Sequence, residues 1–89
     1  MTMTVQEQTN EIRGALRAHI AEVLYVEPDE VGEDTAFRDL GLDSVLGVEL
    51  IGTINREYGL KEEADVLYQH STLSELTTYI AGKTAQEDS

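Results

Sequence analysis

The first part of the chain has apolar residues at helical spacing. These residues are Ile12, Leu16, Ile20, Val23 and Leu24. Steps of three and four residues place side chains on one face of a helix, so the pattern predicts an amphipathic helix over residues 5–25. Thr4 and Glu7 have the spacing of a capping box at its start. Pro28 prevents its continuation, because proline lacks an N–H group.

A second apolar stripe predicts a helix over residues 44–58. The stripe contains Val45, Leu46, Val48, Leu50, Ile51, Ile54 and Tyr58. Gly59 suits the left-handed position that follows many helices, and Leu60 can fold back onto the last turn. Gly47 and Gly52 weaken the helix intrinsically, and either close packing or the close approach of a partner would explain them.

Two further helices are predicted near the C-terminus. Residues 62–68 read as a short helix with Val66 and Leu67 facing inward. Residues 73–81 read as a longer helix, whose apolar stripe consists of Leu73, Leu76, Tyr79 and Ile80.

The limits of this last helix have sequence signals of their own. Thr72 and Glu75 have the spacing of a capping box at its start. Gly82 predicts its end, and we expect residues 83–89 to form a flexible tail.

Residues 26–43 show no clear period and are predicted to be a long acidic loop. Isolated apolar residues can each anchor this loop to a core; they are Val26, Val31, Phe37, Leu40 and Leu42. Long loops that are fixed in this way are often functional. No stretch of the chain alternates with period two, so the predicted fold is all-α, a small four-helix bundle of three main helices and one short one.

The length of 89 residues fits one domain, which we assign to residues 1–89 with a folded core over 5–82. Met1 and the short tails favour a discrete protein, although a piece excised from a larger protein would look alike. We also expect a monomer in the cytoplasm, with which the absence of cysteine is compatible. No apolar run approaches the ~20 residues that a membrane span needs.

The charge balance disfavours two classes of partner. Eighteen acidic residues against six basic ones give a formal net charge of −12, which repels nucleic acids and anionic membrane surfaces. Residues 27–65 alone contain twelve acidic and three basic residues, a net charge of −9. This excess is either an ordinary solvated surface or, as we favour, a docking face for basic partners.

Candidate catalytic residues are few. The chain has two histidines, His19 and His70, and no cysteine, which disfavours a compact metal site or a catalytic triad. The acidic loop does not have the ligand spacing of a calcium-binding hand, and no glycine-rich phosphate loop is present. We therefore expect no catalysis by this chain alone, although carboxylate pairs remain open.

The sequence GLDSV at residues 41–45 joins the acidic loop to the second predicted helix. Ser44 stands where the first N–H groups of a helix lack internal partners, and these donors favour an attached anion. The alternative interpretation is that Asp43 or Ser44 is simply an N-cap.

The surrounding sequence resembles the acyl carrier protein family, in which the pattern LG-x-DSL-x-x-VEL marks a carrier serine. The matching residues are Phe37, Leu40, Gly41, Asp43, Ser44, Val48, Glu49 and Leu50. The later segment ADVLYQHSTLSELTTYI resembles the end of carrier domains of the polyketide type. Together, the resemblance covers about residues 10–82.

This resemblance implies a cofactor and a set of partners. A phosphopantetheinyl transferase would attach 4′-phosphopantetheine from coenzyme A to Ser44, and the thiol of that arm would hold acyl intermediates as thioesters. An acyl- or aminoacyl-loading enzyme and a ketosynthase or other acyl-processing enzymes would then act on the loaded chain. The residues expected to be recognised by partners are Asp43, Val45, Glu49, Arg56 and Glu57. The expected acyl crevice is lined by Val48, Ile51, Val66 and Leu67.

Several residues depart from the family pattern and leave the pathway open. Val45 replaces the usual leucine, Arg56 adds a positive charge, and Tyr68, Gln69 and Ser71 replace the usual Phe, Asp and Pro. We favour a carrier in polyketide or related secondary metabolism over a carrier of fatty-acyl or aminoacyl groups, including D-alanyl. An acidic interaction module that is never modified and a hydrolase that uses carboxylates are the alternatives from other classes.

Overall fold

The three long helices each begin after a residue whose side chain accepts a hydrogen bond from the first turn. In the computed structural model, which describes residues 4–87, these helices are α1 (Val5–Leu24), α2 (Ser44–Tyr58) and α4 (Leu73–Glu87). A short helix, α3 (Val66–Gln69), and two 3-10 helices, η1 (Pro28–Glu30) and η2 (Phe37–Leu40), complete the described chain. Residues 4–87 contain no strand, and the prediction of an all-α fold with three main helices and one short helix is confirmed.

The predicted cap of α1 is present in full. The Oγ1 atom of Thr4 accepts from the Glu7 N–H, and the Glu7 carboxylate accepts from the Thr4 N–H, both at 3.1 Å. These two bonds satisfy backbone donors that the helix itself leaves unpaired. Hydrogen bonding of the Glu7 carboxylate to the backbone N–H and to the side chain of Thr4 lowers the pKa of Glu7.

The predicted limits of α4 are partly wrong. Thr72 Oγ1 accepts from Glu75 N–H at 3.2 Å as expected, but the Glu75 carboxylate accepts from Ser71 N–H rather than from Thr72. The helix does not stop at Gly82 and continues to Glu87. A glycine ends a helix only where its backbone turns left-handed, and Gly82 remains helical at a cost of about 1 kcal/mol relative to alanine. The flexibility of residues 83–89 stays a prediction, and residues 88–89 lie outside the described chain.

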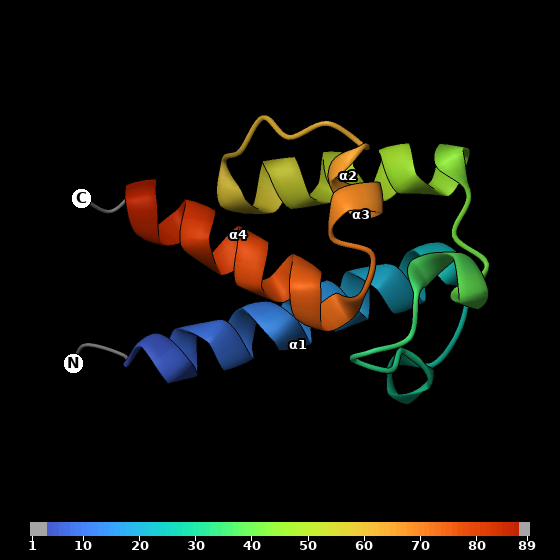
Figure 1. Ribbon diagram of the computed structural model, residues 1–89, viewed down its shortest axis with the longest axis horizontal. Coiled ribbons are helices and arrows are strands. Elements are labelled where there is room, and N and C mark those ends of the chain that lie inside the picture. The colour runs from blue at the N-terminus through green and yellow to red at the C-terminus, as the bar shows by residue number, and fades with distance from the viewer. Residues whose placement is uncertain (1–3, 88–89) are drawn as a thin grey trace.

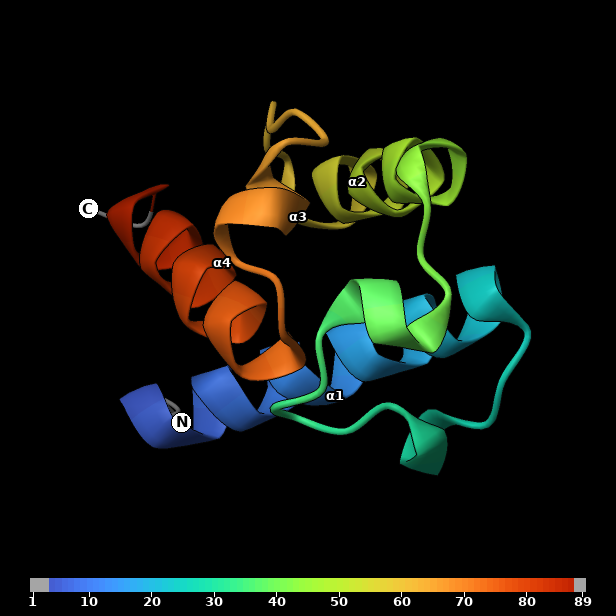
Figure 2. The ribbon, with the colours of Figure 1, turned by 45° about the vertical axis from the view of Figure 1, so that its right-hand side comes forward.

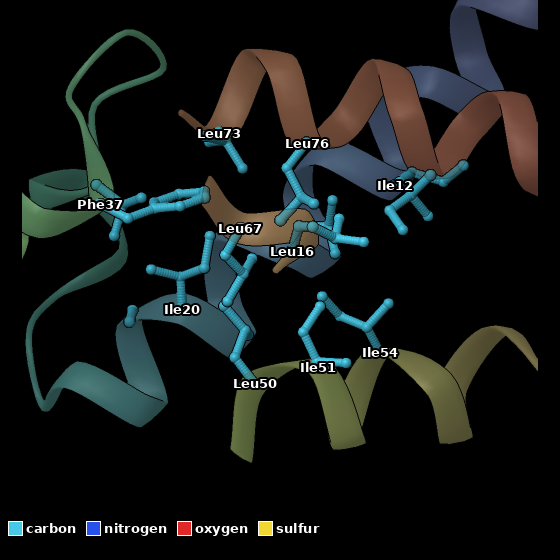
Figure 3. Close-up of a cluster of buried hydrophobic side chains, with 14 residues drawn as sticks. Ile12, Leu16, Ile20, Phe37, Leu50, Ile51, Ile54, Leu67, Leu73 and Leu76 are labelled. Carbon is cyan, nitrogen blue, oxygen red and sulfur yellow. The ribbon is translucent and has the colours of Figure 1, made fainter. Parts of the chain in front are cut away.

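Helices α1 and α4 lie side by side, and α2 packs over α1 (Figure 1). The short α3 lies between α2 and α4 in both views of the ribbon (Figures 1 and 2). Side chains from all four α-helices and from η2 meet in one core (Figure 3), whose labelled members are Ile12, Leu16, Ile20, Phe37, Leu50, Ile51, Ile54, Leu67, Leu73 and Leu76. Within residues 4–87, no helix combines the length and the apolar character that crossing a membrane requires.

The acidic segment between α1 and α2 is fixed to the rest of the molecule, as its apolar residues suggested. Val31 and Phe37 are buried, while Val26, Leu40 and Leu42 are partly buried against the core. Two backbone bonds tie the segment to the start of α4: Phe37 N–H donates to Ser71 O at 2.8 Å, and Ser74 N–H donates to Glu33 O at 2.9 Å. The two 3-10 helices inside the segment were not predicted from the sequence.

Helix α3 is shorter than the predicted range of 62–68. The side chain of Asn55 both donates to Glu62 O and accepts from Glu62 N–H, at 3.0 and 2.9 Å. Because both backbone groups of Glu62 are bonded to this amide, that residue is not available to begin a helix. Val66 and Leu67 are buried, which confirms the predicted inward face.

Candidate functional site

Ser44 is the first residue of α2, and its side chain is exposed. The preceding residue, Asp43, is the N-cap, and its Oδ1 atom accepts from Leu46 N–H at 2.8 Å. The cap predicted as an alternative role therefore belongs to Asp43. Within residues 4–87, the Ser44 hydroxyl makes no hydrogen bond, so it is available for chemistry.

The turn before α2 presents this serine. Gly41 has a φ of 99°, in the left-handed region that glycine adopts without strain. Its N–H donates to Arg38 O, and Leu42 N–H donates to Phe37 O at 3.1 Å. Phe37 is buried, and its N–H is bonded to Ser71 O. These contacts fix the position of the turn, and therefore of Ser44, relative to the core.

A cavity of about 490 Å³ opens beside Ser44. Its lining residues are Ala36, Arg38, Leu42, Asp43, Ser44, Gly47, Val48, Ala64, Leu67, Tyr68 and Ser71. Of the four residues expected in an acyl crevice, Val48 and Leu67 line this cavity. Ile51 and Val66 do not line it, because their side chains are buried in the core behind it.

No sequence pattern placed the remaining lining residues at one site. Ala36, Arg38 and Leu42 come from the loop before α2, whereas Ala64 and Ser71 flank α3. Only the fold brings these segments together. The one indication in the sequence was that Leu42 could anchor the loop to the core.

Three exposed apolar side chains lie near the start of α2 and on α3. Val45, Val48 and Tyr68 are 71%, 63% and 72% exposed. The last two also line the cavity. Exposed apolar side chains that gather at the edge of one cavity, as Val48 and Tyr68 do, are typical of a contact site.

The candidate recognition residues divide into two groups along α2. Asp43, Val45 and Glu49 are exposed within the first two turns, next to Ser44. Arg56 and Glu57 are also exposed but lie 12 and 13 residues further on, which corresponds to about 18–20 Å along a helix. The structure therefore does not bring all five residues together.

Each of the two histidines contacts a side chain on another element of the fold, and neither lines the cavity beside Ser44. His70 stacks on the ring of Tyr79, with ring centroids 4.4 Å apart, and His19 Nε2 lies 3.8 Å from Glu57 Oε2. Among the described residues, no group of three or more side chains is arranged to hold a metal ion.

A polar cluster holds the segment that carries α3 against α4. The Tyr79 hydroxyl donates to Glu62 Oε1 at 2.6 Å, and Lys83 Nζ lies 3.8 Å from the other carboxylate oxygen. The hydrogen bond to Glu62 raises the pKa of Tyr79 to about 12, with a smaller contribution from desolvation. Since Ala64 and Leu67 follow Glu62, this cluster fixes one wall of the cavity.

Comparison with known proteins gives consistent matches. A protein family described as a phosphopantetheine attachment site matches residues 14–80. The polyketide synthase PksL of Bacillus subtilis is 40% identical over 82 residues, which are 83% of this chain and 2% of that protein. The pikromycin synthase component PikAII of Streptomyces venezuelae is 34% identical over 84 residues, covering 93% and 2%. The chain thus spans about 2% of the length of these relatives.

Solved structures share the fold. The HMG-ACPI domain from the CurA module of Lyngbya majuscula has a TM-score of 0.85 and 44% identity, over 91% of this chain and 82% of that one. A free-standing peptidyl carrier protein from Acinetobacter baumannii has a TM-score of 0.81 over 84% of this chain and 94% of that one. At 24% identity, this second likeness shows the fold alone.

Proposed function

The chain belongs to the family of phosphopantetheine attachment domains, and we propose that Ser44 is its attachment residue. The observation that carries this proposal is the exposed Ser44 hydroxyl, unbonded within residues 4–87, at the first turn of α2 and at the edge of a cavity. When bound, 4′-phosphopantetheine supplies a flexible arm ending in a thiol, on which acyl groups are held as thioesters.

The residues around Ser44 fit this group. Within the described chain, the backbone N–H groups of Ser44 and Val45 have no partner, whereas that of Leu46 is bonded to Asp43. Unpaired donors at a helix start stabilise an anion such as a phosphodiester. The cavity beside them is large enough to take part of an arm and has a mostly apolar lining.

We propose that the arm or its acyl group binds in this cavity. The cavity is lined by only part of the crevice residues expected from the sequence. Val48 and Leu67 would contact the ligand directly, and Ile51 and Val66 would support them from the core. Gly47 contributes by its size, because a side chain at this position would project toward Leu67.

The chain is a carrier domain of the polyketide type, and such domains work with ketosynthases and other acyl-processing enzymes. We propose that it is their substrate and not a catalyst, and that a phosphopantetheinyl transferase and an acyl-loading enzyme also act on it. Asp43, Val45 and Glu49 would form the contact next to Ser44. Arg56 and Glu57 would be reached only by a partner that covers the length of α2. A cytoplasmic location and a monomeric state remain predictions.

The attachment is tested by intact mass after incubation with coenzyme A and a broad-specificity phosphopantetheinyl transferase. We expect the wild-type chain to gain one phosphopantetheine and Ser44→Ala to gain none, while Ser71→Ala, which changes another serine of the cavity lining, gains as much as wild type. No gain in the wild type would favour the unmodified interaction module. A gain that survives Ser44→Ala would place the arm elsewhere.

The cargo is tested by offering the modified chain malonyl, fatty-acyl and aminoacyl donors with their loading enzymes. The similarity to polyketide synthases leads us to expect loading by enzymes of that class. Loading by an aminoacyl donor alone would contradict the polyketide assignment. Turnover of an ester substrate without any partner would support the hydrolase alternative.

A further inference from the structure

One positive charge lines the cavity beside Ser44. It belongs to Arg38, and the only other ionisable carboxylate or cationic group in the lining is Asp43. The Arg38 side chain is exposed, and among the side chains described, those of residues 4–84, its guanidinium has no ion-pair or hydrogen-bond partner. By contrast, Arg13 and Arg17 both lie within 4.0 Å of Glu33.

The backbone around Arg38 is fixed, although its side chain is not. Arg38 lies in η2, its carbonyl accepts from Gly41 N–H at 3.2 Å, and the preceding Phe37 is buried. The turn that presents Ser44 therefore also presents Arg38. Because the backbone is already fixed, only the side chain of Arg38 has to be ordered when the guanidinium binds an anion at the same cavity.

Attachment of the arm would place like charges close together at the start of α2. The phosphodiester would add a negative charge directly beside Asp43, within a segment that already has a net charge of −9. The helix start offers only partial compensation, since the Asp43 carboxylate already accepts from Leu46 N–H. A nearby cation is needed to offset the added charge.

We propose that the guanidinium of Arg38 is the counter-ion of the phosphodiester on Ser44 and holds that end of the arm against the cavity. The proposal rests on Ser44 being the attachment residue. A guanidinium has parallel N–H donors that match two phosphate oxygens, so it fixes direction as well as charge. Arg38 is then a positioning residue: it takes no part in any reaction of the thiol, but it biases where the arm lies.

The test compares modified and unmodified protein for wild type, Arg38→Gln and Arg56→Gln. Arg56→Gln removes the same charge from another exposed arginine, about 18 Å along α2 from Ser44 and outside the cavity lining. Each sample is first driven to full modification and checked by intact mass. The melting temperature of each form is then measured at low salt, together with the arginine Nε–H resonances.

We expect modification to change the melting temperature of wild type and Arg56→Gln alike. In Arg38→Gln the change in melting temperature on modification should be about 2–4 °C less favourable than the same change in wild type. This is the size of effect that an exposed ion pair gives in a domain of this length. Arg38→Lys should restore part of this difference. The Nε–H resonance of Arg38 should shift on modification, and that of Arg56 should not.

The other outcomes overturn the inference. Equal effects in Arg38→Gln and Arg56→Gln would mean that total charge alone matters. A shift of the Arg38 resonance only when the arm carries a dicarboxylic acyl group, and not when it is bare or carries a neutral one, would make the cargo carboxylate the partner of Arg38. Full modification with no Arg38 effect would overturn only this inference, whereas failure to modify Ser44 would overturn it together with the proposed attachment.

Discussion

A Cβ atom on Gly47 would lie 3.2 Å from Cδ1 of Leu67, so the Leu67 side chain of α3 packs against α2 at this point more tightly than a side chain there would normally permit. Of the two explanations that the sequence left open, close packing is therefore the one that applies to Gly47. It does not apply to Gly52, where a Cβ would make an ordinary contact of 3.6 Å with Arg56 Nη1. The pair Gly47–Leu67 sets how near α3 lies to the first turns of α2.

We predict that alanine has different effects at these two glycines. Gly52→Ala should stabilise the protein by about 0.5–1 kcal/mol, because alanine favours the helix more than glycine does. At Gly47 the added methyl group has to displace Leu67, which offsets that gain or reverses it. Chemical denaturation of both variants measures the difference. An equal gain in stability at both positions would show that Leu67 moves aside freely.

The core contains one hydroxyl without a hydrogen-bond partner in the described chain. Thr77 on α4 is fully buried, and its Oγ1 atom is unsatisfied. We expect Thr77→Val, which has nearly the same shape, to raise the free energy of unfolding by about 1 kcal/mol. Thr78→Val is the control, since the exposed Thr78 hydroxyl donates to Ser74 O at 3.1 Å. A loss of stability in Thr77→Val would reveal a partner for this hydroxyl in solution.

The bond between Tyr79 and Glu62 should make stability depend on alkaline pH. The folded-state pKa of Tyr79 is raised from 10.0 to about 12, so the folded protein retains a proton that the unfolded chain loses. Its stabilisation is fully present below pH 10 and is lost as the pH rises to about 12. We expect Tyr79→Phe to lose about 1 kcal/mol at neutral pH and to show a smaller alkaline decline than wild type. Part of the decline should remain, because burial also raises the pKa of Tyr58.

Urea unfolding of wild type and Tyr79→Phe at several pH values checks this prediction. Tyr25→Phe is the matched control, because the side chain of Tyr25 is 93% exposed. If Tyr79→Phe and wild type lost stability in parallel between pH 10 and 12, the bond to Glu62 would not be the cause.

Charge reversal should affect partner enzymes most near Ser44. We expect Glu49→Lys to slow modification or loading by roughly threefold to tenfold at low salt, because it weakens the field that steers basic partners. Glu22→Lys on α1 is the control, because Glu22 is exposed and has no part in the α1 N-cap. Rates are measured at increasing salt, where the effect should shrink. Equal slowing in both variants would mean that the negative charge serves solubility alone.

Local signals in the sequence predicted most of the helices. The cap at Thr4 and the left-handed Gly59 depend on residues within a few positions of each other, and both are present in the structure. The end of α1 was also predicted to within one residue. Its geometry was not, because Tyr25 adopts a left-handed conformation with a φ of 58°, which a tyrosine does not signal.

The site was predictable in part, for the same reason. The five residues around Ser44 left a simple N-cap as the alternative, and the family pattern is what singled out Ser44 as the candidate. The cavity could not, because it depends on the bond from Phe37 N–H to Ser71 O, which joins positions far apart in the sequence. Arg38 and Ser71 therefore had no visible relation to Ser44 until the fold was known. The bond pattern that shortens α3, from Asn55 to Glu62, is likewise a side-chain contact that periodicity does not contain.

The start of α1 and the end of α4 lie at one end of the molecule, and the start of α2 lies at the other (Figures 1 and 2). The longest dimension of the domain is 38 Å. A fluorescent protein, an affinity tag or a surface anchor fused at either terminus would thus face away from Ser44. Immobilised in this orientation, the domain would present its serine outward to enzymes in solution, which suits it to serial loading and washing on a solid support.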